Sequence, residues 1–208
     1  MTRAVFAGLC LLAINAPATA QQRQELSPRL REATRAAIVA LADSLGAAGL
    51  PASAVYDKAA EGVLKGADDA QILGVVRGLA KRLRESRALL GVDAPHDALL
   101  AASSALYAGV PAAAIRRAVG AGRGRPNAPS VALTLTVLGT LVSQRVPVQV
   151  AAASIEMLLQ RGARDVDLQE FQRRVERDIV GGGAPEDVTT LRAQSVLRTI
   201  DARRPPEG

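Results

Sequence analysis

The chain has 208 residues, a formal net charge of +6, and a composition that is 49% hydrophobic but only 2% aromatic. This length suits one domain with a core of its own, and that core must be packed mainly with aliphatic side chains. The single cysteine, Cys10, and the single histidine, His96, exclude an intrachain disulfide and a metal site with several Cys or His ligands. The scarcity of aromatic rings also disfavours specific binding of single-stranded nucleic acid, which depends on stacking.

Residues 1–20 have the three-part layout of a secretory signal peptide. Arg3 supplies a basic start, residues 4–14 form an apolar run, and a cluster of small residues precedes Gln21. The run is shorter than the roughly 20 apolar residues of a transmembrane helix. We therefore expect cleavage near Ala20, a mature protein that is periplasmic or secreted, and no transmembrane segment after cleavage.

Beyond this segment the chain shows recurrent helix punctuation. Helices commonly end at a Gly in the left-handed conformation, followed by an apolar residue and a Pro or Asp that begins the next helix. The pattern predicts an all-α fold of eight to nine antiparallel helices in one domain over residues 21–200, with a disordered tail over 201–208. The junctions, with Arg in place of Gly at one of them, are Gly49, Gly66, Gly91, Gly109, Arg145, Gly162 and Gly183.

Three of the expected helices carry clear apolar stripes. The apolar residues of each stripe recur at helical spacing, which places them on one side of the helix. We expect the first helix to be capped by Ser27 and Pro28. The stripes consist of Leu30, Ile38, Leu41 and Leu45; of Ile72, Val75, Val76, Leu79 and Leu83; and of Leu168, Phe171, Val175 and Ile179.

One segment is ambiguous. Residues 131–137 alternate with period two and are rich in β-branched side chains, which is typical of a strand. The same region also forms a helical stripe through Val131, Leu135, Leu138 and Val142. No second strand is available to pair with it, and an isolated strand would leave backbone groups unsatisfied. We therefore predict a buried helix.

Two parts of the chain resemble each other. Residues 49–83 align without a gap with residues 145–179, so that Pro51 meets Pro147 and both helix junctions coincide. A third, shorter copy would begin at Gly109. Helix pairs that repeat in this way predict a solenoid-like array, in which each pair buries its apolar face on the next. The alternative is an orthogonal helix bundle in which the similarity is accidental.

The candidate binding site is an Arg-rich segment. Arg116, Arg117, Arg123 and Arg125 lie in or beside a Gly-rich loop that contains no acidic residue. Glycines permit close approach of the backbone, and the forked donors of Arg suit phosphate and carboxylate groups. The segment therefore predicts binding of an anion or a partner. The alternative is a flexible connection between repeats, kept soluble by its charge.

Catalytic motifs are missing from the sequence, which has no nucleophile elbow and no phosphate-binding loop. Asp57 and Glu61 lie one helical turn apart and could perform acid–base chemistry or bind a cation. The neighbouring Lys58 and Lys65 favour a solvated, ion-paired surface instead. His96 suits the polar start of a helix better than a catalytic role. We predict no catalytic residue, no cofactor and no metal.

The sequence thus favours a non-catalytic binding or scaffold module for a protein or an anionic component of the cell envelope, because repeat arrays usually bind along an extended face. One alternative is an enzyme whose site brings Asp57 and Glu61 together with Asp93 or His96. Another is a helical protein that holds a small apolar ligand between its Ala-rich helices. Continuous empty volume would favour this last alternative, and a filled interior would exclude it.

Overall fold

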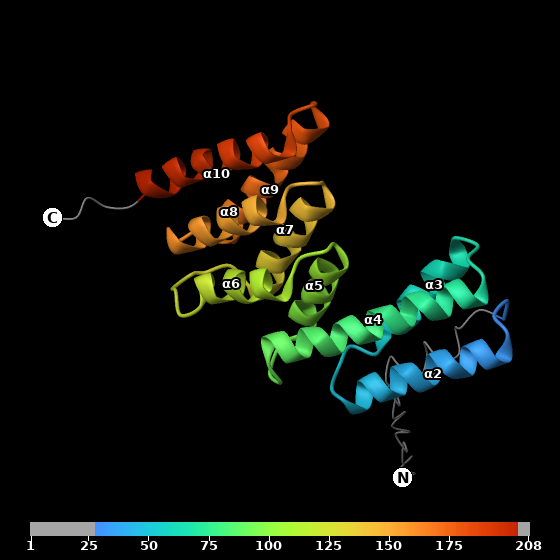
Figure 1. The fold of residues 1–208 in the computed structure, drawn as a ribbon. Helices are drawn as coiled ribbons and strands as arrows, with labels where there is room; N and C mark the ends of the chain where they lie inside the picture. Colours follow the sequence, from blue (N-terminus) through green and yellow to red (C-terminus); the bar gives the residue numbers. More distant parts are fainter. Residues whose placement is uncertain (1–27, 204–208) are drawn as a thin grey trace, which may run out of the picture.

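The computed structural model describes residues 28–203, and all regular secondary structure in that range is α-helical (Figure 1). The all-α prediction is confirmed. The expected signal peptide at residues 1–20 and the end of the expected tail at 204–208 lie outside the described residues. In chain order the helices are α2 (Glu32–Ala47), α3 (Ser53–Leu64), α4 (Asp69–Leu90), α5 (His96–Tyr107), α6 (Ala112–Gly122), α7 (Val131–Ser143), α8 (Val148–Gln160), α9 (Asp165–Val180) and α10 (Pro185–Ala202).

Both ends of the described chain differ from the expected boundaries by a few residues. The first helix begins at Glu32 and not directly after Ser27. The last helix continues to Ala202, which the sequence places in the tail. Its end is held by Arg203, whose guanidinium donates to both carboxylate oxygens of the buried Asp167 at 2.8 Å. A charge-assisted contact of this kind extends the ordered chain beyond the point where apolar periodicity ends.

Among the described residues, six helix ends are closed by the same turn. In each, a residue with positive φ is followed by a residue whose N–H donates to the carbonyl five positions earlier. The positive-φ residues are Gly49, Gly66, Gly109, Arg145, Gly162 and Gly182. The predicted junctions are confirmed with two differences. Gly182 takes the left-handed conformation in place of Gly183, and Gly91 ends α4 at a φ of 101° without this turn.

The apolar side chains form two clusters. One joins α2, α3 and α4 and includes Leu99 of α5, and the other extends from α5 to α10. Half-buried Leu90, at the end of α4, packs against both clusters. Figure 1 shows the corresponding arrangement, with α2 to α4 side by side and α5 to α10 grouped above the carboxyl-terminal half of α4. None of the helices between residues 28 and 203 combines the length and the apolar character that crossing a membrane requires.

The ambiguous segment is helical, as predicted. It forms α7, which buries most of its length and packs against α5, α6, α8 and α9. Gly139 permits the close approach to α5, because a Cβ atom at this position would lie 3.1 Å from the Cα of Ala105. The β-branched residues of α7 are helical because they are surrounded by helices, and packing overrides a weak local preference.

The stripe predicted for α4 is wrong at Val75, whose side chain is 46% exposed. Ile72, Val76 and Leu83 are buried as expected, whereas Leu79 is half-buried. Val75 lines a hollow between α4 and α5, which leaves its side chain partly solvated. In α9 the predicted stripe is confirmed, since Leu168, Phe171 and Val175 are fully buried and Ile179 is half-buried.

The two aligned segments differ in their neighbours. In the first, α3 packs against α4 and α2. In the second, α8 packs mainly against α6 and α10, and it contacts α7 as well. The turns of the two segments match, but the packing does not, so the arrangement as repeated helix pairs stays a prediction.

Candidate functional site

The predicted Arg-rich segment covers the second half of α6 and its connection to α7. Arg116 and Arg117 lie within α6, Arg123 caps its carboxyl end, and Arg125 follows in the connection. The predicted Gly-rich loop is shorter than expected, because α6 continues through Gly122.

Two of the four arginines bind other parts of the protein. Arg117 donates from Nε to the carboxylate of Glu156 on α8 at 3.0 Å. Arg125 donates to the main-chain carbonyls of Ala121 at 3.1 Å and Gln160 at 2.8 Å. Arg125 thereby fastens the connection to the ends of α6 and α8, so that the connection is held by specific contacts.

The other two arginines have no such contact. Within the described part of the chain, no acidic side chain pairs with Arg116 or Arg123, and both side chains are exposed. They are seven residues apart, which places them on the same side of α6. The segment therefore contributes two unpaired guanidinium groups to one surface.

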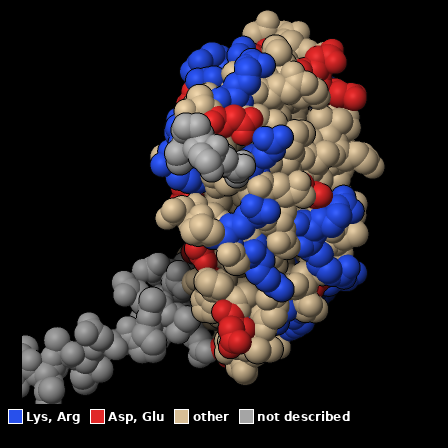
Figure 2. Space-filling view, turned by 90° about the vertical axis from the view of Figure 1, so that its left-hand side faces the viewer, with Lys and Arg blue, Asp and Glu red and all other residues tan. Residues whose placement is uncertain are grey.

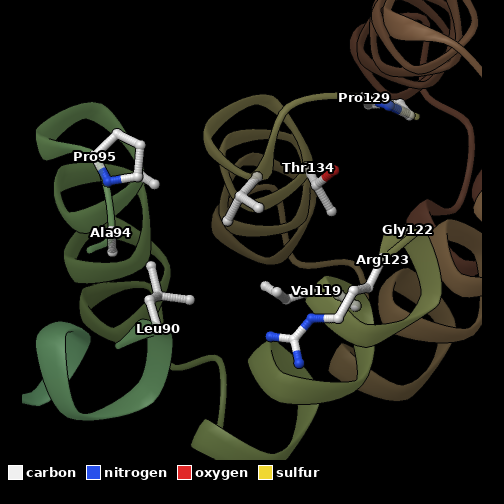
Figure 3. A pocket seen from close by; sticks show the side chains of 11 residues that line it. Leu90, Ala94, Pro95, Val119, Gly122, Arg123, Pro129 and Thr134 are labelled. Carbon is white, nitrogen blue, oxygen red and sulfur yellow. The ribbon is translucent and has the colours of Figure 1, made fainter. Parts of the chain in front are cut away.

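Arg123 stands at a hollow that we call the α4–α7 hollow. It has a volume of about 200 Å³ and lies between the end of α4, the start of α5, the end of α6 and the start of α7 (Figure 3). Arg123 and Thr134 are the only lining residues with polar side chains. The lining consists of Leu90, Ala94, Pro95, Ala98, Ala118, Val119, Gly122, Arg123, Pro129, Val131 and Thr134.

The position of the guanidinium follows from the end of α6. Arg123 leaves the helix with an extended backbone, at φ −64° and ψ 131°. Figure 3 shows its side chain extending from the α6 wall toward the side of the hollow formed by Leu90. A positive charge therefore lies beside an apolar cavity, an arrangement typical of sites for ligands that carry both an apolar body and an anionic group.

Basic side chains also gather on this side of the protein. Figure 2 shows the face at the left of Figure 1, where α6, α8 and α10 reach the surface. Lys and Arg form several groups on it, interrupted by smaller groups of Asp and Glu. Such a face attracts anionic partners over a range set by the ionic strength.

Two further hollows lie along the exposed side of α5. An open groove of about 630 Å³ runs along the outer side of the contact between α5 and α7, and its walls include Leu100, Tyr107 and Thr136. A smaller hollow of about 200 Å³ lies between α4 and α5 and shares Tyr107 with the groove. The guanidinium of Arg82 stacks on the Tyr107 ring at 4.8 Å from its centroid. Neither hollow is lined by any of the four predicted arginines.

Two of the residues considered for catalysis, Glu61 and His96, have other partners. Lys58 and Lys65 both donate to Glu61, and these hydrogen bonds lower the pKa of Glu61 from its usual 4.5 to about 2. His96 places Nε2 at 3.2 Å from the carbonyl oxygen of Gly49, which joins α5 to the α2–α3 turn.

The structure does not bring the proposed catalytic set together in a described hollow. None of the three hollows is lined by Asp57, Glu61, Asp93 or His96. Across residues 28–203, no group of three or more His, Cys, Asp or Glu side chains is arranged to hold a metal ion.

Arg123 is predicted from the sequence, whereas the hollow is not. The apolar lining residues belong to four helices or their connections. In the sequence, each of these residues has the pattern of an ordinary apolar helix face. The only local signal is the absence of acidic residues around Arg123. Arg117 shares this signal and nevertheless pairs with the distant Glu156, so the sequence alone does not single out Arg123.

The fold and the site define an all-α protein with an apolar hollow beside an unpaired arginine. No protein-family model, no curated protein and no solved structure matches this chain.

Proposed function

We propose that this chain is a non-catalytic binding module of the periplasm or the extracellular space. It contacts an anionic partner, a protein or a component of the cell envelope, through the surface around Arg116 and Arg123. The observation that carries this proposal is the unpaired Arg123 guanidinium beside an apolar hollow.

The pairing pattern supports a binding role for these two arginines. The pairings of Arg117 and Arg125 join α6 and its connection to α8. Arg116 and Arg123 make no such contact, so their five-donor forks are available to a carboxylate or phosphate of a partner. The basic groups in Figure 2 favour the approach of an anionic partner to the same side.

We further propose that the helices are arranged as repeated antiparallel pairs. The supporting observation is that the turns of residues 49–83 and 145–179 have matching hydrogen bonds. The third turn of this kind, at Gly109, lies where the shorter copy is expected to begin. An array of pairs would offer a partner an extended binding surface.

The binding role is tested by affinity capture from envelope extract, with the chain from Gln21 to Gly208 as bait. We expect partners to be retained at low salt, and the variant Arg116→Gln/Arg123→Gln to lose them. Arg77→Gln/Arg198→Gln is the matched control, because it removes the same charge from exposed arginines on α4 and α10. Equal retention by all three baits, or equal loss in both variants, would contradict the proposal.

The proposed location is tested separately. We expect the protein recovered from the periplasm or the culture medium to begin at Gln21, as determined by mass spectrometry of the intact chain. An intact chain that begins at Met1 and is found in the cytoplasm would contradict the proposed export.

A further inference from the structure

We infer that the α4–α7 hollow binds a small amphiphilic carboxylate, a compound with an apolar chain of about six to eight carbon atoms and one carboxylate group. The apolar chain enters the hollow, and the carboxylate binds the Arg123 guanidinium. This inference rests on the proposed function, because the same Arg123 supplies the contact with an anion.

The size of the ligand follows from the volume of the hollow. A cavity of about 150 Å³ lined by aliphatic side chains is enough to bind benzene. The α4–α7 hollow, at about 200 Å³, therefore has room for slightly more than six carbon atoms. Small residues on opposite walls, Ala98 on α5 and Ala118 on α6, leave this space open.

The apolar character of the ligand follows from the walls. Leu90, Val119 and Val131 line the hollow with aliphatic side chains from three different helices. Thr134 offers the only hydroxyl among the lining residues, so a ligand rich in polar groups would lose hydrogen bonds to water without replacement. Each buried CH₂ group contributes about fourfold to the affinity.

The charge of the ligand follows from Arg123. Its guanidinium is the only charged group among the lining residues, and no acidic side chain of the described chain pairs with it. A carboxylate matches the guanidinium fork and balances its single charge. A cationic amphiphile would be repelled, and a neutral one would forgo the charge-assisted hydrogen bonds.

The inference is tested by titrating the ¹⁵N-labelled protein with octanoate at pH 7 and following amide chemical shifts. We expect shifts concentrated at Leu90, Val119, Val131 and Thr134, with saturable binding. Butyrate, which has four fewer CH₂ groups, should bind at least tenfold more weakly. Octylamine, which has the opposite charge, should produce no saturable shifts at these residues.

Three variants separate the contributions of charge and space. Arg123→Gln removes the charge and should weaken octanoate binding by about tenfold. Arg77→Gln is the matched control, because it removes an equal charge from an exposed residue of α4 that does not line the hollow, and its affinity should stay within twofold. Val119→Phe fills the half-buried α6 wall and should abolish binding while circular dichroism confirms the fold.

Three results would overturn the inference: no saturable octanoate binding, equal affinity of Arg123→Gln and the native chain, or octylamine binding as tight as octanoate. The failure of this inference is distinguishable from that of the proposed function. If Val119→Phe binds no octanoate and still captures the envelope partner, the two ligands use different parts of the surface. If octanoate binds as expected but no partner is captured by any bait, the proposed function fails and the ligand site stands.

Discussion

Residues 49–83 and 145–179 offer a comparison within one chain. Their helix pairs are joined by the same turn: the N–H of Ala67 donates to the carbonyl of Gly62, and the N–H of the aligned Ala163 donates to that of Leu158, both at 3.0 Å. Their second helices nevertheless bury different faces. The side chain of Val75 is 46% exposed, whereas the aligned Phe171 is fully buried.

The difference shows which features of a helix are local. The turn depends on a residue with positive φ and on hydrogen bonds within six residues, so similar sequences form it in both segments. The buried face depends on the neighbouring helices. α4 is contacted by α2, α3, α5 and, at fewer positions, α6, whereas α9 is contacted by α7 and α10. Successive side chains of a helix point about 100° apart. A different set of neighbouring helices is therefore enough to bury one position in α4 and the adjacent aligned position in α9.

The largest expected effect tests this contrast directly. Phe171→Ala should lower the free energy of unfolding by about 3–5 kcal/mol, because it empties a fully buried site. Val75→Ala, at the aligned position, should change it by less than about 1 kcal/mol, because the side chain is partly solvated. Urea denaturation followed by circular dichroism measures both. Similar losses for the two variants would mean that the segments bury the same face.

A second test compares two helical glycines in different surroundings, Gly139 of α7 and Gly74 of α4. Gly139 of α7 lies against the backbone of α5, and Gly139→Leu should lower the free energy of unfolding by about 1–3 kcal/mol, because the helices must separate. Gly74→Ala is the control, since a Cβ atom there meets no atom within 4 Å. It should stabilise α4 by about 1 kcal/mol through helix propensity. A Gly139→Leu variant as stable as the native chain would show that α5 and α7 are not in close contact.

A third test exchanges the residues of two aligned turns. Gly49 and Arg145 occupy the same left-handed position, with φ of 66° and 69°. Arg145→Gly should stabilise the protein by about 1 kcal/mol, and Gly49→Ala should destabilise it by about the same amount. A Cβ atom at Gly49 would make only an ordinary contact, 3.6 Å from Arg87 Nη2, so the loss reports the backbone conformation. Thermal unfolding of both variants measures these changes. Shifts of the melting temperature in the same direction for both variants would contradict the alignment of the two turns.

The sequence predicts most of the local structure. The junction at Arg145 was expected although it has no glycine, because the following Val146 and Pro147 match the other junctions. The helix α7 was expected in spite of its alternating pattern, because an isolated strand is unfavourable. Both inferences use interactions within a few residues or a general requirement of the backbone.

The parts that the sequence does not predict depend on how helices are placed. The exposure of Val75 depends on how α3 and α5 are placed against α4, because they leave a hollow beside this residue. The pairing of Arg117 with Glu156 joins residues that are 39 positions apart. The α4–α7 hollow is left where four helix ends meet, and its apolar residues cannot be told from core residues by periodicity.

The smallest expected effect concerns the exposed sides of α3 and α8. Glu61 of α3 accepts hydrogen bonds from Lys58 and Lys65, and the aligned residue of α8 is Met157. The hydrogen bond from Lys58, followed by that from Lys65, lowers the pKa of Glu61 to about 2. A carboxyl group with a lowered pKa stabilises the folded state above its usual pKa of 4.5, and this contribution is lost as the pH falls from 4.5 toward 2.

We therefore expect the side-chain carboxyl ¹³C signal of Glu61 to titrate with a midpoint near pH 2, measured by NMR. In the variant Lys58→Met/Lys65→Met the midpoint should return toward 4.5, because both donors are gone. A native midpoint near 4.5 would show that the two lysines do not hold Glu61 in solution. It would also remove the ion-paired group that distinguishes the surface of α3 from that of α8. In α8 the residue aligned with Lys58 is Ser154, which is buried.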